Sequence, residues 1–207
     1  MSFDVCVTRR LGDRLIAAEF AGEAGLTALF GPSGAGKSSV LNMVAGLLRP
    51  DAGHIMVGDV TLYSSADGIE RPARARRAGY VFQDGRLFPH KRVRDNLLYG
   101  WNLANPAERW MDLDEAVRFL GIGHLLNRWP HTLSGGEAPR VAWGRALLSA
   151  PRFLWRDEPL ASLDRARRED IMAVIVRLRD ELKLPILYVS HDREEVEQLA
   201  TTIVPLD

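Results

Sequence analysis

A glycine-rich segment between an apolar run and a helical pattern constrains this chain more than any other feature. Residues 26–30 are apolar, the residues Gly-Pro-Ser-Gly-Ala-Gly-Lys-Ser follow, and a helical pattern then continues to residue 45. Strand, loop and helix in this order form a phosphate-binding unit, because glycines let backbone N–H groups surround an anion at a helix start. The predicted nucleotide-binding residues are Gly31, Pro32, Ser33, Gly34, Ala35, Gly36, Lys37, Ser38 and Ser39.

Two side chains in this segment have specific chemistry. The glycine-rich segment matches the pattern G-x-x-x-x-G-K-[ST], in which the lysine reaches the β- and γ-phosphates and the hydroxyl is a ligand of Mg²⁺. Lys37 and Ser38 occupy these two positions. We therefore expect a nucleoside triphosphate and Mg²⁺ as cofactors.

Composition limits the class of protein. The 207 residues are 46% hydrophobic, enough for one large domain with a buried core. Lys and Arg together number 27, as do Asp and Glu, so the net charge does not favour nucleic acid as a partner. The single cysteine, Cys6, is expected to be a packed side chain in a reducing compartment. No apolar run approaches the roughly 18 residues of a membrane span, and the N-terminus lacks a secretory pattern.

Short apolar runs alternate with helical patterns along the chain, which predicts an α/β fold. Two runs, 54–57 and 60–63, flank Gly58-Asp59 and indicate an antiparallel hairpin. The polar residues 64–77 contain several arginines, and we expect them to form a solvated loop rather than a nucleic-acid contact. The other predicted strands are residues 3–8, 14–20, 26–30, 79–83, 153–156, 186–190 and 202–206, with a helix over 165–182.

The segment from residue 85 to residue 150 differs from the rest. Its helix-like stretches are broken by proline and glycine, and it contains no convincing strand. We therefore predict one domain, 1–207, whose catalytic core comprises 1–84 and 151–207 and carries a helical lobe at 85–150.

Acidic residues end one of the predicted strands. Asp157 and Glu158 follow residues 153–156 and precede Pro159. Phosphoryl transfer needs a carboxylate near Mg²⁺ and a group that orients the attacking water. We expect Asp157 to lie beside Ser38 and the metal, and Glu158 to polarise the water.

His191 directly follows the apolar run 186–190. Ligands of open α/β sheets bind at the carboxyl ends of the strands, so the ring could reach the γ-phosphate there. The other histidines lack metal-ligand spacing and receive no role; they are His54, His90, His124 and His131.

Five stretches occur in one characteristic order: GPSGAGKSS, YVFQDGRLFPH, LSGGE, DEPLASLD and YVSHD. In the sequence and order of these stretches, most of the chain closely resembles the ATP-binding cassette ATPases. The resemblance implies a P-loop NTPase core of the RecA-like type with an antiparallel β edge and an inserted α-helical lobe. The stretches GYVFQDGRLFPHKRVRDNLLYG and ILYVSHDREE are most similar to the ATPases of molybdate importers.

The resemblance also implies roles for matching positions. Gln83 corresponds to a glutamine that touches Mg²⁺ and senses the permease, and Asp164 to a loop that links two nucleotide sites across a dimer. The family signature binds the γ-phosphate of ATP held by a second subunit. Ser134 is a favourable N-cap, and a helix start attracts anions. The signature residues are Leu133, Ser134, Gly135, Gly136 and Glu137.

Three positions depart from the family pattern. Arg156 replaces an apolar residue before Asp157, and a lone buried guanidinium costs several kcal/mol. We expect Arg156 to have an acidic partner; a stem that reaches an exposed edge and a weakened site are the alternatives. Pro139 follows the signature and would bend a helix beyond its first turn. The adenine-stacking aromatic of the family is replaced by Arg-Arg-Leu-Gly at 9–12, so apolar or arginine contact with adenine is expected.

The leading hypothesis is the ATPase subunit of an importer. Two copies would close around two ATP molecules and drive a transmembrane permease docked near Gln83 and the helical lobe, at the inner face of the cell membrane. A periplasmic solute-binding protein would take part indirectly. The expected solute is molybdate or a similar oxyanion, and thiamine, iron and sulfate remain open. We expect no carboxy-terminal oxyanion-sensing domain.

Two other classes remain open. Cassette ATPases that act on DNA or ribosomes share the signature, but they usually carry long coiled-coil insertions or tandem cassettes, which 207 residues do not accommodate. A regulatory subunit with a degenerate nucleotide site is the other alternative, because Arg156 and Pro139 depart from the family pattern.

Overall fold

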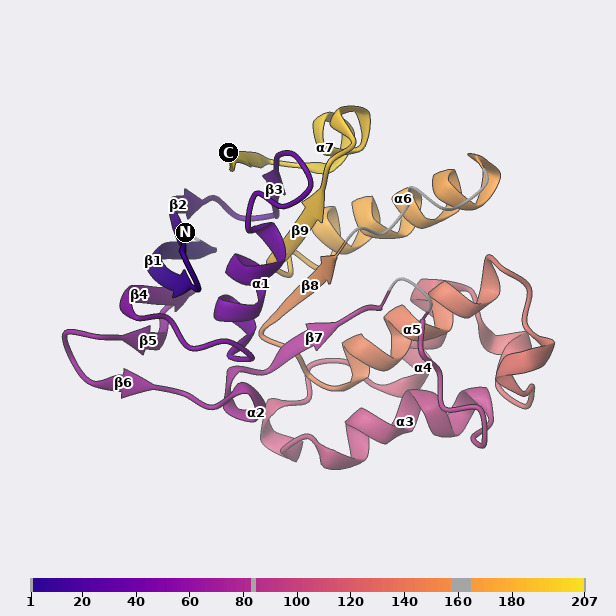
Figure 1. Cartoon of the computed structure of the whole chain (residues 1–207). Helices are drawn as coiled ribbons and strands as arrows, with labels where there is room; N and C mark the ends of the chain where they lie inside the picture. Colours follow the sequence, from indigo (N-terminus) through magenta and orange to yellow (C-terminus); the bar gives the residue numbers. More distant parts are fainter. Residues whose placement is uncertain (1, 83–84, 158–164, 207) are drawn as a thin grey trace.

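The computed structural model describes residues 2–82, 85–157 and 165–206. Its strands form an antiparallel and a parallel sheet, and Figure 1 shows the antiparallel one at the left. The strand order of the antiparallel sheet is β2-β1-β4-β5-β6. Its strands are β1 (Phe3–Leu11), β2 (Arg14–Gly22), β4 (Ala52–Val57), β5 (Val60–Ser64) and β6 (Ile69–Glu70).

The parallel sheet holds the middle of the molecule. Its strand order is β10-β3-β9-β8-β7, and every pairing in it is parallel. The strands are β3 (Leu26–Phe30), β7 (Ala78–Tyr80), β8 (Phe153–Asp157), β9 (Ile186–Ser190) and β10 (Thr202–Pro205). A parallel sheet is stable when both of its faces are covered, which explains why β9 is buried along its whole length.

Alternate residues of β9 belong to two different hydrophobic cores. Leu187 and Val189 pack with the antiparallel sheet and α1 (Lys37–Ala45). Ile186 and Tyr188 pack on the other face with α5 (Glu137–Leu148), α6 (Arg165–Asp180) and α7 (Arg193–Leu199). The parallel sheet therefore lies between two layers.

The segment from residue 85 to residue 150 is helical, and its described residues contain no strand. Figure 1 shows its helices at the lower right, below the parallel sheet. This arrangement confirms the predicted fold class, an α/β core with an antiparallel edge and an α-helical insertion. The elements of this segment are α3 (Val93–Leu103), η1 (Pro106–Glu108), α4 (Leu113–Leu120), η2 (Gly123–Leu125), η3 (Pro130–Thr132) and α5.

Local sequence signals explain several helix boundaries. The carboxylate of Asp112 accepts from the Glu115 amide at 2.8 Å, and the Glu115 carboxylate accepts from the Asp112 amide at 2.8 Å, which starts α4. Gly121 ends α4 in the left-handed conformation. None of the helices in the described segments is both long and apolar enough to cross a bilayer.

Most predicted elements are present, with shifted ends. The strands at 26–30 and 186–190 match, the strand expected at 79–83 is the shorter β7, and the helix expected at 165–182 ends at Asp180. Sequence reasoning missed α7. It is short and buries only three of its side chains, one of them a glutamate, so its apolar period is weak.

The prediction of a solvated loop at residues 64–77 is wrong. The segment contains β6 and α2 (Ala73–Arg76), and Arg76 is only 2% exposed. Its Nη1 donates to the carbonyl oxygens of Met43 at 2.8 Å and Val44 at 3.1 Å. The last carbonyls of a helix lack intrahelical donors, so a cation at the end of α1 is favourable. Arg76 therefore fixes the C-terminal end of α1.

Arg76→Ala is expected to lower the free energy of unfolding by about 2–4 kcal/mol, because buried carbonyls lose a charged donor and a cavity remains. Urea denaturation followed by circular dichroism measures this change. The exposed Arg74 offers a matched control, and Arg74→Ala should stay within about 0.5 kcal/mol of wild type. Equal effects of the two substitutions would contradict a structural role for Arg76.

Candidate nucleotide site

The loop between β3 and α1 has the backbone of a phosphate cradle. Gly34 and Gly36 have φ values of 86° and 92°, in the left-handed region that favours glycine. A Cβ at Gly31 would lie 1.9 Å from the carbonyl oxygen of Leu206, so only glycine fits there. The glycines predicted from the motif are therefore required by the local geometry.

Lys37 lies inside this loop. Its Nζ donates to the carbonyl oxygens of Gly31 at 2.8 Å and Pro32 at 2.7 Å, and the residue is 5% exposed. Beside it is a cavity of about 210 Å³. The cavity is lined by Ser33, Gly34, Gly36, Lys37, Ser38 and Ser39. An ammonium, hydroxyls and a helix start at one small cavity suit an anionic ligand.

Strand register brings other predicted residues to the same edge. Phe30 of β3 pairs with Ser190 of β9, so the residues that follow them, Gly31 and His191, begin their turns side by side. On the other side of β9, Asp157 pairs with Val189. His191 is exposed at this edge. The sheet thus places the backbone of Asp157, the phosphate loop and His191 together.

Several predicted residues cannot be placed further. Gln83, Glu158 and Asp164 lie outside the described residues, as does the side chain of Asp157. Their roles at magnesium, at the attacking water and between two subunits stay predictions.

The predicted signature precedes α5. The amide of Ser134 donates to Oε2 of Glu137 at 2.7 Å, and the amide of Glu137 donates to Oγ of Ser134 at 3.3 Å. The N-cap of α5 is Gly136 rather than Ser134, but these reciprocal bonds resemble a capping box and close the turn. Within the described part of the chain, the amides of Gly135 and Gly136 donate no hydrogen bond. Two donors are therefore available to a ligand.

Pro139 does not interrupt α5. It is the third residue of the helix, which continues without interruption from Glu137 to Leu148. The first N–H groups of a helix have no intrahelical acceptor, so a proline in the first turn removes no hydrogen bond of the helix. The predicted conflict between Pro139 and the signature is absent from the structure.

Glu137 has an electrostatic role in the signature turn. The hydrogen bond donated by the Ser134 amide, and after it the one from the Ser134 hydroxyl, lower the pKa of the Glu137 carboxyl. Arg128 and His124 each approach Oε1 of Glu137 at 3.6 Å. The charged carboxylate is therefore the form that holds the turn.

An arginine beside the phosphate loop was missed by the sequence reasoning. Nη1 of Arg14, at the start of β2, donates to the carbonyl oxygen of Gly34. Arg9, in the stretch that replaces the adenine-stacking aromatic, instead pairs with Asp51 at 2.5 Å. In the sequence, Arg14 stands only at the start of the predicted strand 14–20. Arg14 is thus the arginine that the structure brings to the loop.

Arg156 is 1% exposed, so its stem does not reach an exposed edge. Its Cζ lies 5.5 Å from the centroid of the Trp143 ring on α5. Burial lowers the pKa of Arg156 to about 10, although the nearby Tyr188 and Glu195 act in the opposite direction. The guanidinium therefore keeps its charge at neutral pH, in the electrostatic field of a buried carboxylate.

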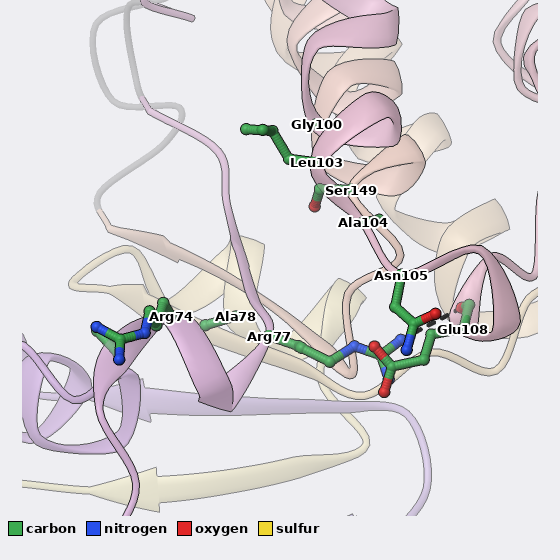
Figure 2. A pocket seen from close by; sticks show the side chains of 10 residues that line it. Arg74, Arg77, Ala78, Gly100, Leu103, Ala104, Asn105, Glu108 and Ser149 are labelled. Carbon is green, nitrogen blue, oxygen red and sulfur yellow. Dashed lines mark hydrogen bonds and ion pairs between the residues drawn. The ribbon is translucent and has the colours of Figure 1, made fainter.

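A second hollow, of about 390 Å³, lies between α3 and the α2–β7 segment. Figure 2 shows Gly100 and Leu103 of α3 on one side and Arg74 and Ala78 on the other. Arg77 Nη1 pairs with Oε1 of Glu108 at 2.9 Å at its margin. Leu103 is 74% exposed and presents an apolar side chain at this hollow.

Comparison with known proteins finds one matching family and many similar proteins. The family described as "ABC transporter" matches residues 21–161, more than half of the chain. The molybdenum import ATP-binding protein ModC of Brucella abortus (strain 2308) is 56% identical over 98% of the chain. ModC of Mesorhizobium japonicum is 53% identical over 100% of it. The chain spans 56% of the length of each of these two relatives.

Solved structures agree on the fold. The structure of cbiO1 from Clostridium perfringens, part of the ABC transporter complex cbiONQ, is 26% identical, with a TM-score of 0.80. That match covers 100% of this chain and 86% of the other. The dimeric structure of MJ0796, a bacterial ABC transporter cassette, is 25% identical over 99% of this chain and 93% of its own, with a TM-score of 0.72.

The signature turn should depend on the charge of Glu137. Glu137→Gln is expected to lower the thermal midpoint at neutral pH, because the Ser134 amide loses a charged acceptor. The folded-state pKa of Glu137 is depressed, so its contribution is present above the unfolded-state pKa and is lost as pH falls through the folded-state value. The difference between wild type and variant should therefore shrink as pH falls below the ordinary glutamate pKa of about 4.3 and be lost in stronger acid. A difference that grows in acid would contradict this assignment.

Proposed function

Because the chain belongs to the ABC transporter family, we propose that it binds and hydrolyses ATP to drive an importer. The observation that carries the proposal is the shared edge of β3, β9 and β8, where the phosphate loop, His191 and Asp157 meet. Lys37 and the amides of the loop would hold the β- and γ-phosphates. His191 would contact the γ-phosphate, and Glu158 would orient the attacking water.

The residues of this edge fit Mg²⁺. Ser38 is exposed at the first turn of α1, and Asp157 ends a strand that β9 separates from β3. Hydroxyl, carboxylate and amide oxygens are hard donors of the kind that Mg²⁺ accepts, so Ser38, Asp157 and Gln83 form a suitable set. When bound, Mg²⁺ neutralises charge on the phosphates.

A second copy of the chain would complete each site. Leu133, Ser134, Gly135, Gly136 and Glu137 are not among the residues that line the loop cavity. Gly135 and Gly136 have available amides at a helix start, which favours an anion. ATP bound by one subunit would be contacted by this turn of the other, and Asp164 would lie between the two sites. The dimeric cassette among the structural relatives supports this arrangement.

The permease would dock at the hollow between α3 and the α2–β7 segment. Exposed Leu103 offers an apolar contact, and Arg74 lies on the opposite side. β7 also leads towards Gln83, so movement at the hollow could reach the nucleotide site. Docking here would hold the subunit at the inner face of the membrane.

Molybdate is the solute that the relatives favour. Both relatives named above are molybdenum import proteins and match nearly the whole chain. A periplasmic binding protein would deliver the oxyanion to the permease.

The division of the chain into a catalytic core, 1–84 and 151–207, and a helical lobe, 85–150, is also part of this proposal.

Purified protein should hydrolyse ATP. Lys37→Ala should abolish nucleotide binding, and Glu158→Gln should retain binding but slow turnover roughly 10²–10⁴-fold, the range for a positioned base. Phosphate release and ATP binding measure the two steps. Lys183→Ala, at an exposed lysine, is the control and should bind and hydrolyse ATP as wild type does. Full activity of Lys37→Ala, or equal negligible rates of wild type and Glu158→Gln, would contradict the proposed enzyme.

Uptake of molybdate should require the docking hollow. Cells that express the chain with its permease should accumulate molybdate, and Leu103→Asp should reduce uptake at least about tenfold, because a buried charge opposes docking. Ile203→Asp is the matched control and should leave molybdate uptake at the wild-type level. Ile203 is 46% exposed on β10, at the opposite edge of the sheet from β7. Uptake of sulfate, thiamine or iron in place of molybdate would overturn the solute assignment.

A further inference from the structure

A carboxylate and a guanidinium are buried on the same face of the parallel sheet. Glu195 of α7 and Arg156 of β8 are each 1% exposed. Tyr188 of β9 lies next to both, because it pairs with Arg156 in the strand ladder and its hydroxyl donates to Oε2 of Glu195 at 2.9 Å. Burial raises the pKa of Tyr188, so its hydroxyl keeps the proton that it donates. This face is the one covered by α5 and α7.

Glu195 is connected to the residues on both sides of His191. Ser190 Oγ donates to Oε2 of Glu195 at 3.1 Å and accepts the amide of Asp192 at 3.0 Å. The amide of Glu195 donates to Oδ1 of Asp192 at 3.2 Å. The carboxylate of Glu195 therefore contacts Ser190, the residue before His191, and through Ser190 Oγ it is connected to the amide of Asp192, the residue after it.

One cation pairs with that carboxylate, and a second lies in its electrostatic field. Arg168 of α6 places Nη2 at 3.4 Å from Oε1 of Glu195 and at 2.7 Å from Oδ2 of Asp192. Arg156 lies deeper in the core, over the Trp143 ring of α5. A carboxylate is retained in a protein core when opposite charge and hydrogen bonds offset its lost hydration.

We propose that Glu195 is a positioning residue that holds the His191 turn at the phosphate edge, and that Arg156 supplies the charge that lets this carboxylate be buried. The inference rests on the proposed function, in which His191 acts on bound ATP. It gives Arg156 a supporting role in place of the impairment that its position beside Asp157 suggests. The contact with Trp143 extends the same cluster to the helix behind the signature.

Substitutions at Glu195 test the first part. Glu195→Ala should lower kcat at least about tenfold, because a misplaced His191 loses its contact with the γ-phosphate, with the KM for ATP within about twofold. Glu195→Gln keeps the shape of the side chain and an acceptor for the Tyr188 hydroxyl. Its kcat should therefore lie between those of wild type and Glu195→Ala. Glu194→Gln, at the exposed neighbour on α7, is the matched control and should match wild type.

The same substitution in a protein that already lacks His191 distinguishes positioning of this residue from general destabilisation. In a His191→Ala protein, Glu195→Ala should lower kcat by less than about twofold further, because the group that Glu195 positions is already missing. Equal losses in both backgrounds would show that Glu195 does not act through His191.

Charge balance is tested with Arg156. Arg156→Leu should lower kcat, and the double variant Arg156→Leu/Glu195→Gln should recover at least about threefold, because no buried charge is left uncompensated. Additive losses, or an Arg156→Leu protein that is faster than wild type, would overturn the role given to Arg156.

Hydrogen exchange gives a readout that does not require turnover. The amide of Asp192 should exchange faster in Glu195→Ala than in Glu194→Gln, because the Ser190–Glu195 connection is lost. Wild-type protein without ATPase activity but with this exchange pattern would refute the proposed function and leave the positioning of the turn intact. Unchanged exchange in an active enzyme would refute only the positioning.

Discussion

The parallel register of β3, β9 and β8 is the constraint on which the rest of the structure depends. It places the carboxyl ends of the strands at one edge, so Gly31, His191 and Asp157 are neighbours although they are far apart in the chain. Strands paired in this way must be covered on both faces. The antiparallel sheet with α1 covers one face, and α5 to α7 cover the other.

Several cationic side chains are buried, although the chain as a whole has no net charge. Lys37 donates to carbonyls of its own loop, and Arg76 donates to the carbonyls that end α1. Arg156 instead lies in the field of Glu195 and over an aromatic ring. In each case a charge is removed from water where fixed dipoles or an opposite charge replace its hydration. The phosphate loop, the end of α1 and the His191 turn each have such a charge beside them.

The phosphate loop and the predicted signature turn lie in two parts of the fold. The phosphate loop belongs to the sheet, whereas the signature turn precedes α5 in the helical segment and closes on itself through Ser134 and Glu137. The helical segment packs on the core through α5, whose Trp143 meets Arg156.

Local patterns in the sequence determined the phosphate loop, the hairpin at Gly58-Asp59, the strands at 26–30 and 186–190, and the family. Glycine positions and apolar runs encode backbone conformation and burial within a few residues, so they can be read without a fold. Only the tertiary structure decided that Arg76 closes α1, that Arg14 meets Gly34 and that Glu195 and Arg156 share one buried face. Each of these depends on groups distant in the sequence, and the partner of a buried charge is set by how the layers pack.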